Sequence, residues 1–205
     1  MVYKKSEQLK LLITAFEPFN QQTENASLDV LNQLPNELKG IQVIKLVLPV
    51  VYNNYRYSLF IDRYSPDIII HLGEAGGRHN INLERRAINL MNASIPDNEG
   101  NIKFNQKIFE NGPDEYLTNI DIDTLVLNLI AQKYPIEVSE SAGQYICNQA
   151  FYCSMHELKT RNLPVKVGFI HIPRLNHQIN QPTTPTLSLE IATHSVEAII
   201  NEITK

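Results

Sequence analysis

Two kinds of hydrophobic pattern alternate along the chain. Short, nearly continuous apolar runs are typical of buried strands. They predict strands at 9–15, 41–48, 67–72, 136–138 and 165–172. Between these runs, apolar residues recur every three or four positions, which is typical of amphipathic helices. We expect helices at 52–64, 121–134, 143–160 and 187–203, and another that Asn25 or Ser27 caps and that ends near Leu34.

Strands that alternate with helices indicate an α/β sandwich around a mostly parallel sheet. Three stretches fit this pattern less clearly: 73–79 is expected to be a glycine-bearing loop, 81–90 is ambiguous, and 95–112 is expected to be a loop with a possible hairpin. A chain of 205 residues without repeat or linker is expected to form a single domain over residues 1–205.

The composition narrows the class of partner. With 43% hydrophobic and 20% charged residues, the chain is expected to be globular. Its net charge of −4 and the lack of a basic run argue against a nucleic-acid partner. No apolar stretch approaches a membrane span, and the first 16 residues lack the long apolar core and cleavage site of a signal peptide. We therefore expect a cytoplasmic protein with no membrane partner.

The cysteines fit a reducing compartment. Only Cys147 and Cys153 are present, and on one helix they would lie about 9 Å apart along the axis and face different directions. A disulfide between them is implausible for that geometry.

Cys147 follows a strand and a turn and lies near the start of the expected helix 143–160. Unpaired N–H groups and the positive end of the helix dipole favour a thiolate there, and a thiolate is the reactive form of cysteine. A plain buried side chain is the alternative interpretation of Cys147.

Three polar residues follow or end predicted strands: Cys147, His171 and Glu74. Ligands bind beyond the carboxyl ends of the strands in parallel sheets, so these side chains are expected to converge. A cysteine, a histidine and a carboxylate together form the pattern needed for nucleophilic acyl transfer.

Five segments resemble the pyroglutamyl peptidase I (pyrrolidone-carboxylate peptidase) family of cysteine peptidases. They are LLITAFEPFN (11–20), GEAGGRHNINLERRAIN (73–89), ASIPDNEGN (93–101), SESAGQYICN (139–148) and GFIHIP (168–173). They occur in the right order over nearly the whole chain. The resemblance implies a three-layer α/β/α fold around a twisted sheet, removal of an N-terminal pyroglutamyl group from peptides, and a homo-oligomer, frequently a tetramer.

The resemblance also implies the catalytic residues. Cys147 would be the nucleophile, His171 the base and Glu84 the orienting acid. Glu84 matches the glutamate of the family motif, so it replaces Glu74 in that role. The implied chemistry requires no metal and no other cofactor.

The pocket for the pyroglutamyl ring is expected to have apolar walls and a few polar groups. By resemblance, Phe16 and Phe19 lie against the ring. The other expected substrate-binding residues are Glu74, Ile95, Tyr145 and Ile146.

The chain departs from the family pattern around this pocket. Glu74 stands where the family usually has glutamine, Ser94 where it has arginine, and Arg174 where it has an aromatic or apolar residue. Glutamine can both donate and accept hydrogen bonds, whereas an ionised glutamate only accepts them. The substrate preference of this chain is therefore less secure than its reaction type. The alternatives are a non-catalytic ligand-binding homologue, or a hydrolase with altered cyclic-amide or acyl specificity.

Other motifs have simpler interpretations. GEAGGR lacks the spacing of a dinucleotide fingerprint. Cys153 and His156 have no further cysteine or histidine near them in the sequence to complete a metal site. His71, within a buried strand, is expected to be a hydrogen-bonded core residue.

Overall fold

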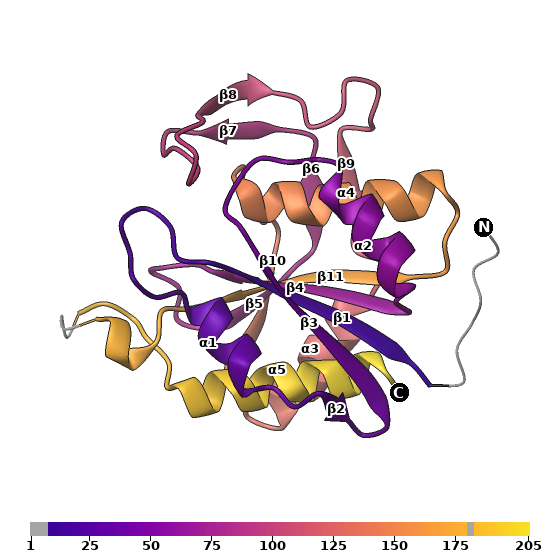
Figure 1. Cartoon of the computed structure of the whole chain (residues 1–205). Coiled ribbons are helices and arrows are strands. Elements are labelled where there is room, and N and C mark those ends of the chain that lie inside the picture. The colour runs from indigo at the N-terminus through magenta and orange to yellow at the C-terminus, as the bar shows by residue number, and fades with distance from the viewer. Residues whose placement is uncertain (1–7, 180–182) are drawn as a thin grey trace.

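The computed structural model describes residues 8–179 and 183–205. Within them a seven-stranded sheet forms the centre of the molecule, in the order β10-β5-β11-β4-β1-β3-β2 (Figure 1). The strands are β1 (Lys10–Phe16), β2 (Glu37–Leu38), β3 (Ile41–Leu48), β4 (Ile68–Glu74), β5 (Ile81–Glu84), β10 (Ile136–Ser139) and β11 (Lys166–Ile172).

The direction of the strands decides which ends meet. Strands β3, β1, β4 and β11 are parallel, whereas β5 is antiparallel to β11 and β10 is parallel to β5. The carboxyl ends of β5 and β10 therefore lie beside the amino end of β11, opposite the end of the sheet where β4 and β11 finish. The mostly parallel sheet is confirmed, but Cys147 does not follow a strand whose carboxyl end lies beside those of β4 and β11.

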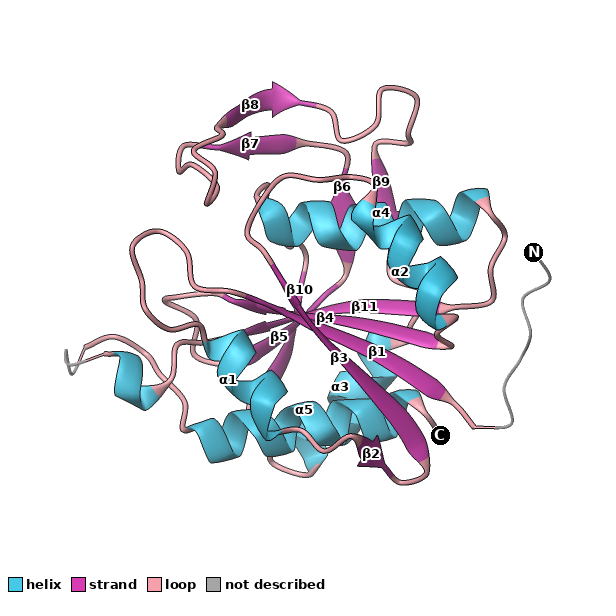
Figure 2. Cartoon of the chain, in the orientation of Figure 1, coloured by secondary structure: helices cyan, strands magenta, loops and turns pink. Residues whose placement is uncertain are grey.

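Helices cover both faces of the sheet (Figure 2). On one face lie α1 (Ala26–Gln33), α3 (Ile122–Ala131) and α5 (Leu189–Ile203); on the other lie α2 (Arg56–Tyr64) and α4 (Ile146–Thr160). A short 3-10 helix, η1 (Asn176–Gln178), follows β11. The three-layer α/β/α expectation is thus confirmed.

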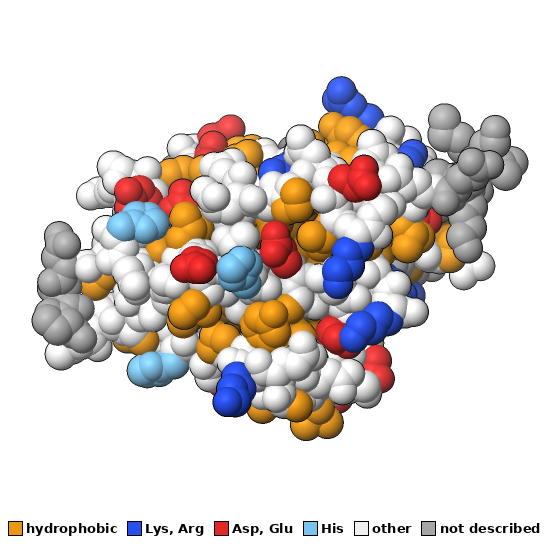
Figure 3. All heavy atoms as spheres, turned by 90° about the horizontal axis from the view of Figure 1, so that it is seen from below, with side chains coloured by type: hydrophobic (Ala, Val, Ile, Leu, Met, Phe, Trp, Pro, Cys, Tyr) orange, Lys and Arg blue, Asp and Glu red, His pale blue; other side chains and the backbone are white. Residues whose placement is uncertain are grey.

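The alternation of side chains along the strands builds two cores. In β1, Leu11 and Ile13 pack with α1, α3 and α5, whereas Leu12 and Phe16 pack with α2 and α4. On the outer surface of the α1, α3 and α5 layer, hydrophobic side chains are interspersed with acidic, basic and histidine side chains (Figure 3). No helix in the described residues is long and apolar enough to cross a membrane.

Two small antiparallel sheets extend the α4 side of the molecule. One pairs β6 (Arg86–Ile88) with β9 (Glu115–Leu117), and the other pairs β7 (Met91–Ala93) with β8 (Lys103–Gln106). The ambiguous stretch 81–90 is therefore mostly strand. The hairpin considered for 95–112 begins earlier, at Met91.

Two helices begin three or four residues later than the hydrophobic pattern predicts. Helix α4 begins at Ile146, because Gly143 adopts φ +81° within the turn that precedes it. Helix α2 begins at Arg56, since the backbone N–H of Tyr52 donates to Asp97 Oδ2 at 3.1 Å outside the helix. For α1 the expected cap is confirmed: the Asn25 side chain accepts from the Ser27 N–H.

The interior position of His71 is also confirmed. Its Nδ1 lies 2.7 Å from Thr14 Oγ1 and its Nε2 lies 2.9 Å from Ser154 Oγ. Burial lowers its pKa to about 3, so this imidazole is a neutral bridge between β1, β4 and α4.

Candidate active site

His171 and Glu84 lie side by side in the centre of the sheet. His171 is near the carboxyl end of β11, and its backbone partner in β5 is Asn82, two residues before Glu84. Residues two apart on a strand share a face, which brings the Glu84 carboxylate to the imidazole. Nδ1 of His171 lies 2.6 Å from Oε1 of Glu84, with 6% and 0% of their side chains exposed.

Arg78, which sequence analysis missed, binds the same carboxylate oxygen. Its Nη1 donates to Glu84 Oε1 at 2.8 Å from the loop between β4 and β5. One buried oxygen thus accepts a hydrogen bond from a guanidinium and another from the imidazole. The only available signal was the closeness of Arg78 to Glu84 in sequence, which does not predict this contact across a loop.

Cys147 lies on the same face of the sheet, as the second residue of α4. A Cβ added to Gly73 would lie 3.0 Å from its Sγ, and Gly73 is the backbone partner of His171. Phe169, two residues before His171, contacts the same point, and its ring centroid lies 4.7 Å from that of the imidazole, tilted by 50°. The sulfur therefore faces the strand pair that carries His171.

The turn at 140–145 makes this position possible. It returns the chain from the end of β10, at one edge of the sheet, to Gly73 near the carboxyl end of β4. Among the described residues no hydrogen bond joins Sγ of Cys147 to His171. Catalytic hydrogen bonds are often long before substrate binds, so this separation is compatible with a nucleophile and its base.

The protonation states of Cys147 and His171 differ from the expectation. Burial raises the pKa of the Cys147 thiol to about 12, and Glu84 adds to the rise; Arg78 and the residue's own N–H oppose it. The lowered pKa expected at a helix start is therefore wrong, because desolvation outweighs the helix terminus. Burial also lowers the pKa of His171, against the contact with Glu84. The resting pair is a thiol and a neutral imidazole.

A small cavity opens beside the sulfur. About 250 Å³ of empty space, its opening to solvent included, lies between Phe16, Phe19, Asn25, Val50, Glu74, Tyr145, Ile146 and Cys147. The aromatic rings of Phe19 and Tyr145 lie 6.1 Å apart. Of the expected pocket residues, Ile95 does not line this cavity. Mostly apolar walls beside a thiol suit a small, neutral acyl group.

Glu74 lies in the cavity wall, away from His171. Its carboxylate accepts from the Ala26 N–H at 2.8 Å, from Gln178 Nε2 at 2.8 Å and from Arg174 Nε at 3.3 Å. The positional expectation that Glu74 joins the cysteine and histidine as the orienting acid is therefore wrong, since Glu84 occupies that place.

Comparison with known proteins agrees with this geometry. Residues 9–205 match the family model described as pyroglutamyl peptidase. The chain is 40% identical to the pyrrolidone-carboxylate peptidase of Thermococcus onnurineus, over 94% of this chain and 97% of that one. The structure of Bacillus amyloliquefaciens pyroglutamyl peptidase I matches with a TM-score of 0.87 and 36% identity, covering 94% and 95% of the two chains. A mutant pyrrolidone carboxyl peptidase from Pyrococcus furiosus matches with a TM-score of 0.90 and 33% identity, covering 96% and 98%.

The chain belongs to the pyroglutamyl peptidase family. The resemblance found in the sequence is thereby confirmed, and with it the class of enzyme, a cysteine peptidase that hydrolyses pyroglutamyl substrates. All five segments that carried the resemblance lie within the matched residues.

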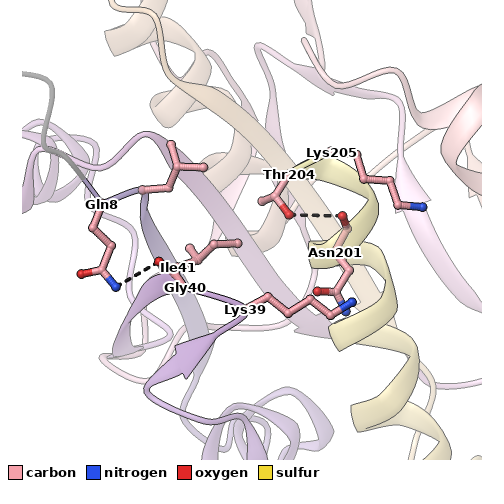
Figure 4. A pocket seen from close by; sticks show the side chains of 8 residues that line it. Gln8, Lys39, Gly40, Ile41, Asn201, Thr204 and Lys205 are labelled. Carbon is pink, nitrogen blue, oxygen red and sulfur yellow. Dashed lines mark hydrogen bonds between the residues drawn. The ribbon is translucent and has the colours of Figure 1, made fainter.

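Another hollow in the described part of the chain has a different lining. A hollow between Gly40 and the end of α5 is lined by Lys39 and Lys205 but by no cysteine, histidine, aspartate or glutamate side chain (Figure 4). In the described ranges no three histidine, cysteine or acidic side chains cluster as metal ligands. His156, considered with Cys153 as a ligand, instead contacts Tyr116 Oη at 3.0 Å.

Proposed function

We propose that the chain hydrolyses the amide bond between an N-terminal pyroglutamyl group and the next residue of a peptide, with Cys147, His171 and Glu84 as the catalytic residues. The observation that carries this proposal is the 2.6 Å contact between His171 and Glu84 on the face of the sheet to which Cys147 Sγ points. Family membership supports the substrate class.

The first step is acylation. Nε2 of the neutral His171 takes the proton of the Cys147 thiol as the sulfur attacks the amide carbonyl, which becomes a tetrahedral oxyanion. The N–H of Cys147 lies in the first turn of α4, where it has no acceptor within the helix, and it is our candidate donor to that oxyanion. The carbon–nitrogen bond then breaks, and the imidazolium gives its proton to the leaving amine.

The second step is hydrolysis of the thioester. His171 takes a proton from a water molecule, whose oxygen attacks the thioester carbonyl. The carbon–sulfur bond breaks, pyroglutamate leaves, and the proton returns to the sulfur. In both steps the Glu84 carboxylate holds Nδ1 protonated and stabilises the imidazolium.

The pocket assignment follows from the cavity. We propose that the lactam ring lies between Phe16, Phe19 and Tyr145, with its carbonyl carbon toward Cys147. Ile146 and Glu74 also line this cavity. Ile95 is the weakest of the expected contacts, because it does not line the cavity.

Three further properties stay predictions. We propose a homo-oligomer, a tetramer by resemblance; a single domain over residues 1–205; and a cytoplasmic location, where a reducing environment would keep Cys147 free.

A chromogenic pyroglutamyl amide tests the function. We expect turnover by the wild type, a loss of about 10⁴-fold or more in Cys147→Ala, and normal turnover in the matched control Cys153→Ala. Binding of the lactam without turnover in folded wild type would favour the non-catalytic homologue. Turnover of another cyclic or acyl amide in preference would favour the altered hydrolase.

A further inference from the structure

Arg174 and Glu74 form an ion pair directly behind the cavity. Arg174 follows β11, and its Nε lies 3.3 Å from Oε1 of Glu74, the last residue of β4. Only 2% of the Glu74 side chain is exposed, compared with 33% for Arg174. Glu74 therefore lines the cavity as a buried residue, and its counter-ion is the more exposed member of the pair.

The hydrogen bonds of Glu74 leave it little capacity for a ligand. Oε2 accepts from the Ala26 N–H and from Gln178 Nε2, each at 2.8 Å. With its amide nitrogen turned toward Glu74, Gln22 donates to Oε1 at 3.3 Å while its oxygen accepts from Arg174 Nη2. Two donors at each oxygen use the acceptor sites of a carboxylate. Glu74 thus contributes its charge to the wall, and its hydrogen bonds go to the protein.

The position of Arg174 is fixed by its surroundings. A Cβ added to Gly76 would lie 3.1 Å from the Arg174 Nε, so the guanidinium lies directly against the Gly76 backbone. Its contacts with Glu74 and Gln22 hold the other side. These contacts hold the guanidinium within ion-pair distance of the carboxylate.

We propose that Arg174 is a specificity-determining residue: by neutralising Glu74 in the cavity wall, it makes the pocket select a neutral five-membered ring over a cationic ring of the same size. The inference rests on the proposed function, in which the pocket binds the pyroglutamyl lactam. An N-terminal prolyl group has the same ring without the oxo group and carries a protonated amine. An uncompensated carboxylate beside Cys147 would attract that cation.

The selectivity of the pocket can be measured with small cyclic molecules that contain only the five-membered ring. We would compare neutral 2-pyrrolidone with pyrrolidine, a cation near neutral pH, by the concentration of each that halves the alkylation rate of Cys147. This readout does not depend on turnover. For Arg174→Met we expect the concentration for pyrrolidone to rise and that for pyrrolidine to fall, so that their ratio changes about tenfold or more. The kcat for a pyroglutamyl amide should change less than its KM.

Matched variants separate charge from packing. The double variant Glu74→Gln/Arg174→Met removes both charges and should restore the wild-type ratio to within about threefold. Arg161→Met removes a guanidinium of similar exposure, 34%, that pairs with Asp62 far from the cavity, and should leave the ratio unchanged. If Arg174→Met does not fold, Glu74→Gln alone should move the ratio in the opposite direction.

An unchanged ratio in a folded Arg174→Met or Glu74→Gln variant would overturn the inference. Failure of the wild type to hydrolyse a pyroglutamyl amide would instead overturn the proposed function, whatever the ratio does. A merely structural role for the ion pair would lower the melting temperature of Arg174→Met without moving the ratio, and this outcome also overturns the proposal.

Discussion

Nδ1 of His171 lies 2.6 Å from Oε1 of Glu84, although 87 positions separate them in the sequence. The antiparallel pairing of β5 with β11 produces this contact, because it places Asn82 opposite His171 and Glu84 two residues further along the same face. The contact fixes the proton on Nδ1 and leaves the Nε2 lone pair for the thiol.

Replacing Glu84 by glutamine tests that relationship. We expect kcat for a pyroglutamyl amide to fall by about 10²–10⁴-fold, because the amide holds the imidazole without stabilising its charged form. The KM should change little, since Glu84 does not line the cavity. Steady-state kinetics measure both. Glu137→Gln, on the neighbouring strand β10, is the matched control, and equal losses in the two variants would contradict the role of Glu84.

Arg78 should set the acid limb of the activity profile. Its charge lowers the pKa of His171 and opposes the rise in the pKa of Cys147. In Arg78→Gln the pKa of His171 should rise, so more of the imidazole is protonated at a given acidic pH and the acid limb of kcat/KM moves to higher pH. Loss of activity near neutral pH should be about tenfold. Arg85→Gln, which removes a guanidinium bound to Asp123 at the surface, should leave the limb in place. An acid limb at the wild-type pH in Arg78→Gln would show that the guanidinium does not act on His171.

The sequence predicted the strands of the sheet better than it predicted how the chain reaches the position of Cys147. Apolar runs marked β1, β3, β4 and β11 within one or two residues, because a strand buried on both faces has a continuous hydrophobic signal. The direction of β5 and β10 carries no such signal. Cys147 was therefore expected at the correct edge for the wrong reason, since it is the turn at 140–145 that brings it back there.

The electrostatics of the site were the least predictable part. A cysteine at a helix start is expected to have a lowered pKa, yet packing against Gly73 and the cavity wall desolvates the Cys147 sulfur and raises the pKa instead. Arg78 and Arg174 both reach buried carboxylates from loops. Loop conformation depends on contacts that no periodicity records, so neither ion pair could be predicted from the sequence.

Gly73 should tolerate no side chain. A Cβ there would lie 2.8 Å and 2.9 Å from ring carbons of Phe169 and 3.0 Å from Cys147 Sγ. We expect Gly73→Ala to lower the free energy of unfolding by about 1–3 kcal/mol, through overpacking, and to lower kcat by displacing the sulfur. Chemical denaturation and kinetics measure the two effects. Adding Phe169→Leu should recover part of the stability, because leucine replaces the aromatic ring with a smaller side chain. Wild-type kcat in the single variant would exclude the displacement.

The two thiols should differ in alkylation. Cys147 is partly exposed, whereas Cys153 is fully buried within the core that includes α2 and α4. In native protein we expect Cys147 to react first and Cys153 only after unfolding, as peptide mass spectrometry would measure. Since burial raises the pKa of Cys147 to about 12, its rate should keep rising through alkaline pH. A plateau below about pH 8 would mean that a thiolate already predominates near neutrality. Faster labelling of Cys153 would contradict the buried position.

His71 should make the fold sensitive to mild acid. Burial lowers its pKa from 6.5 to about 3, so below the ordinary value the unfolded state binds a proton that the folded state does not. Its contribution to stability is complete above about pH 6.5 and is lost as the pH falls, with a slope of at most about 1.4 kcal/mol per pH unit. His71→Gln can still bond to Thr14 or Ser154 but cannot titrate. Denaturant unfolding at several pH values between about 4.5 and 7 should therefore give a shallower slope for this variant than for the wild type. Equal slopes would mean that His71 is not the group whose titration makes the fold sensitive to acid.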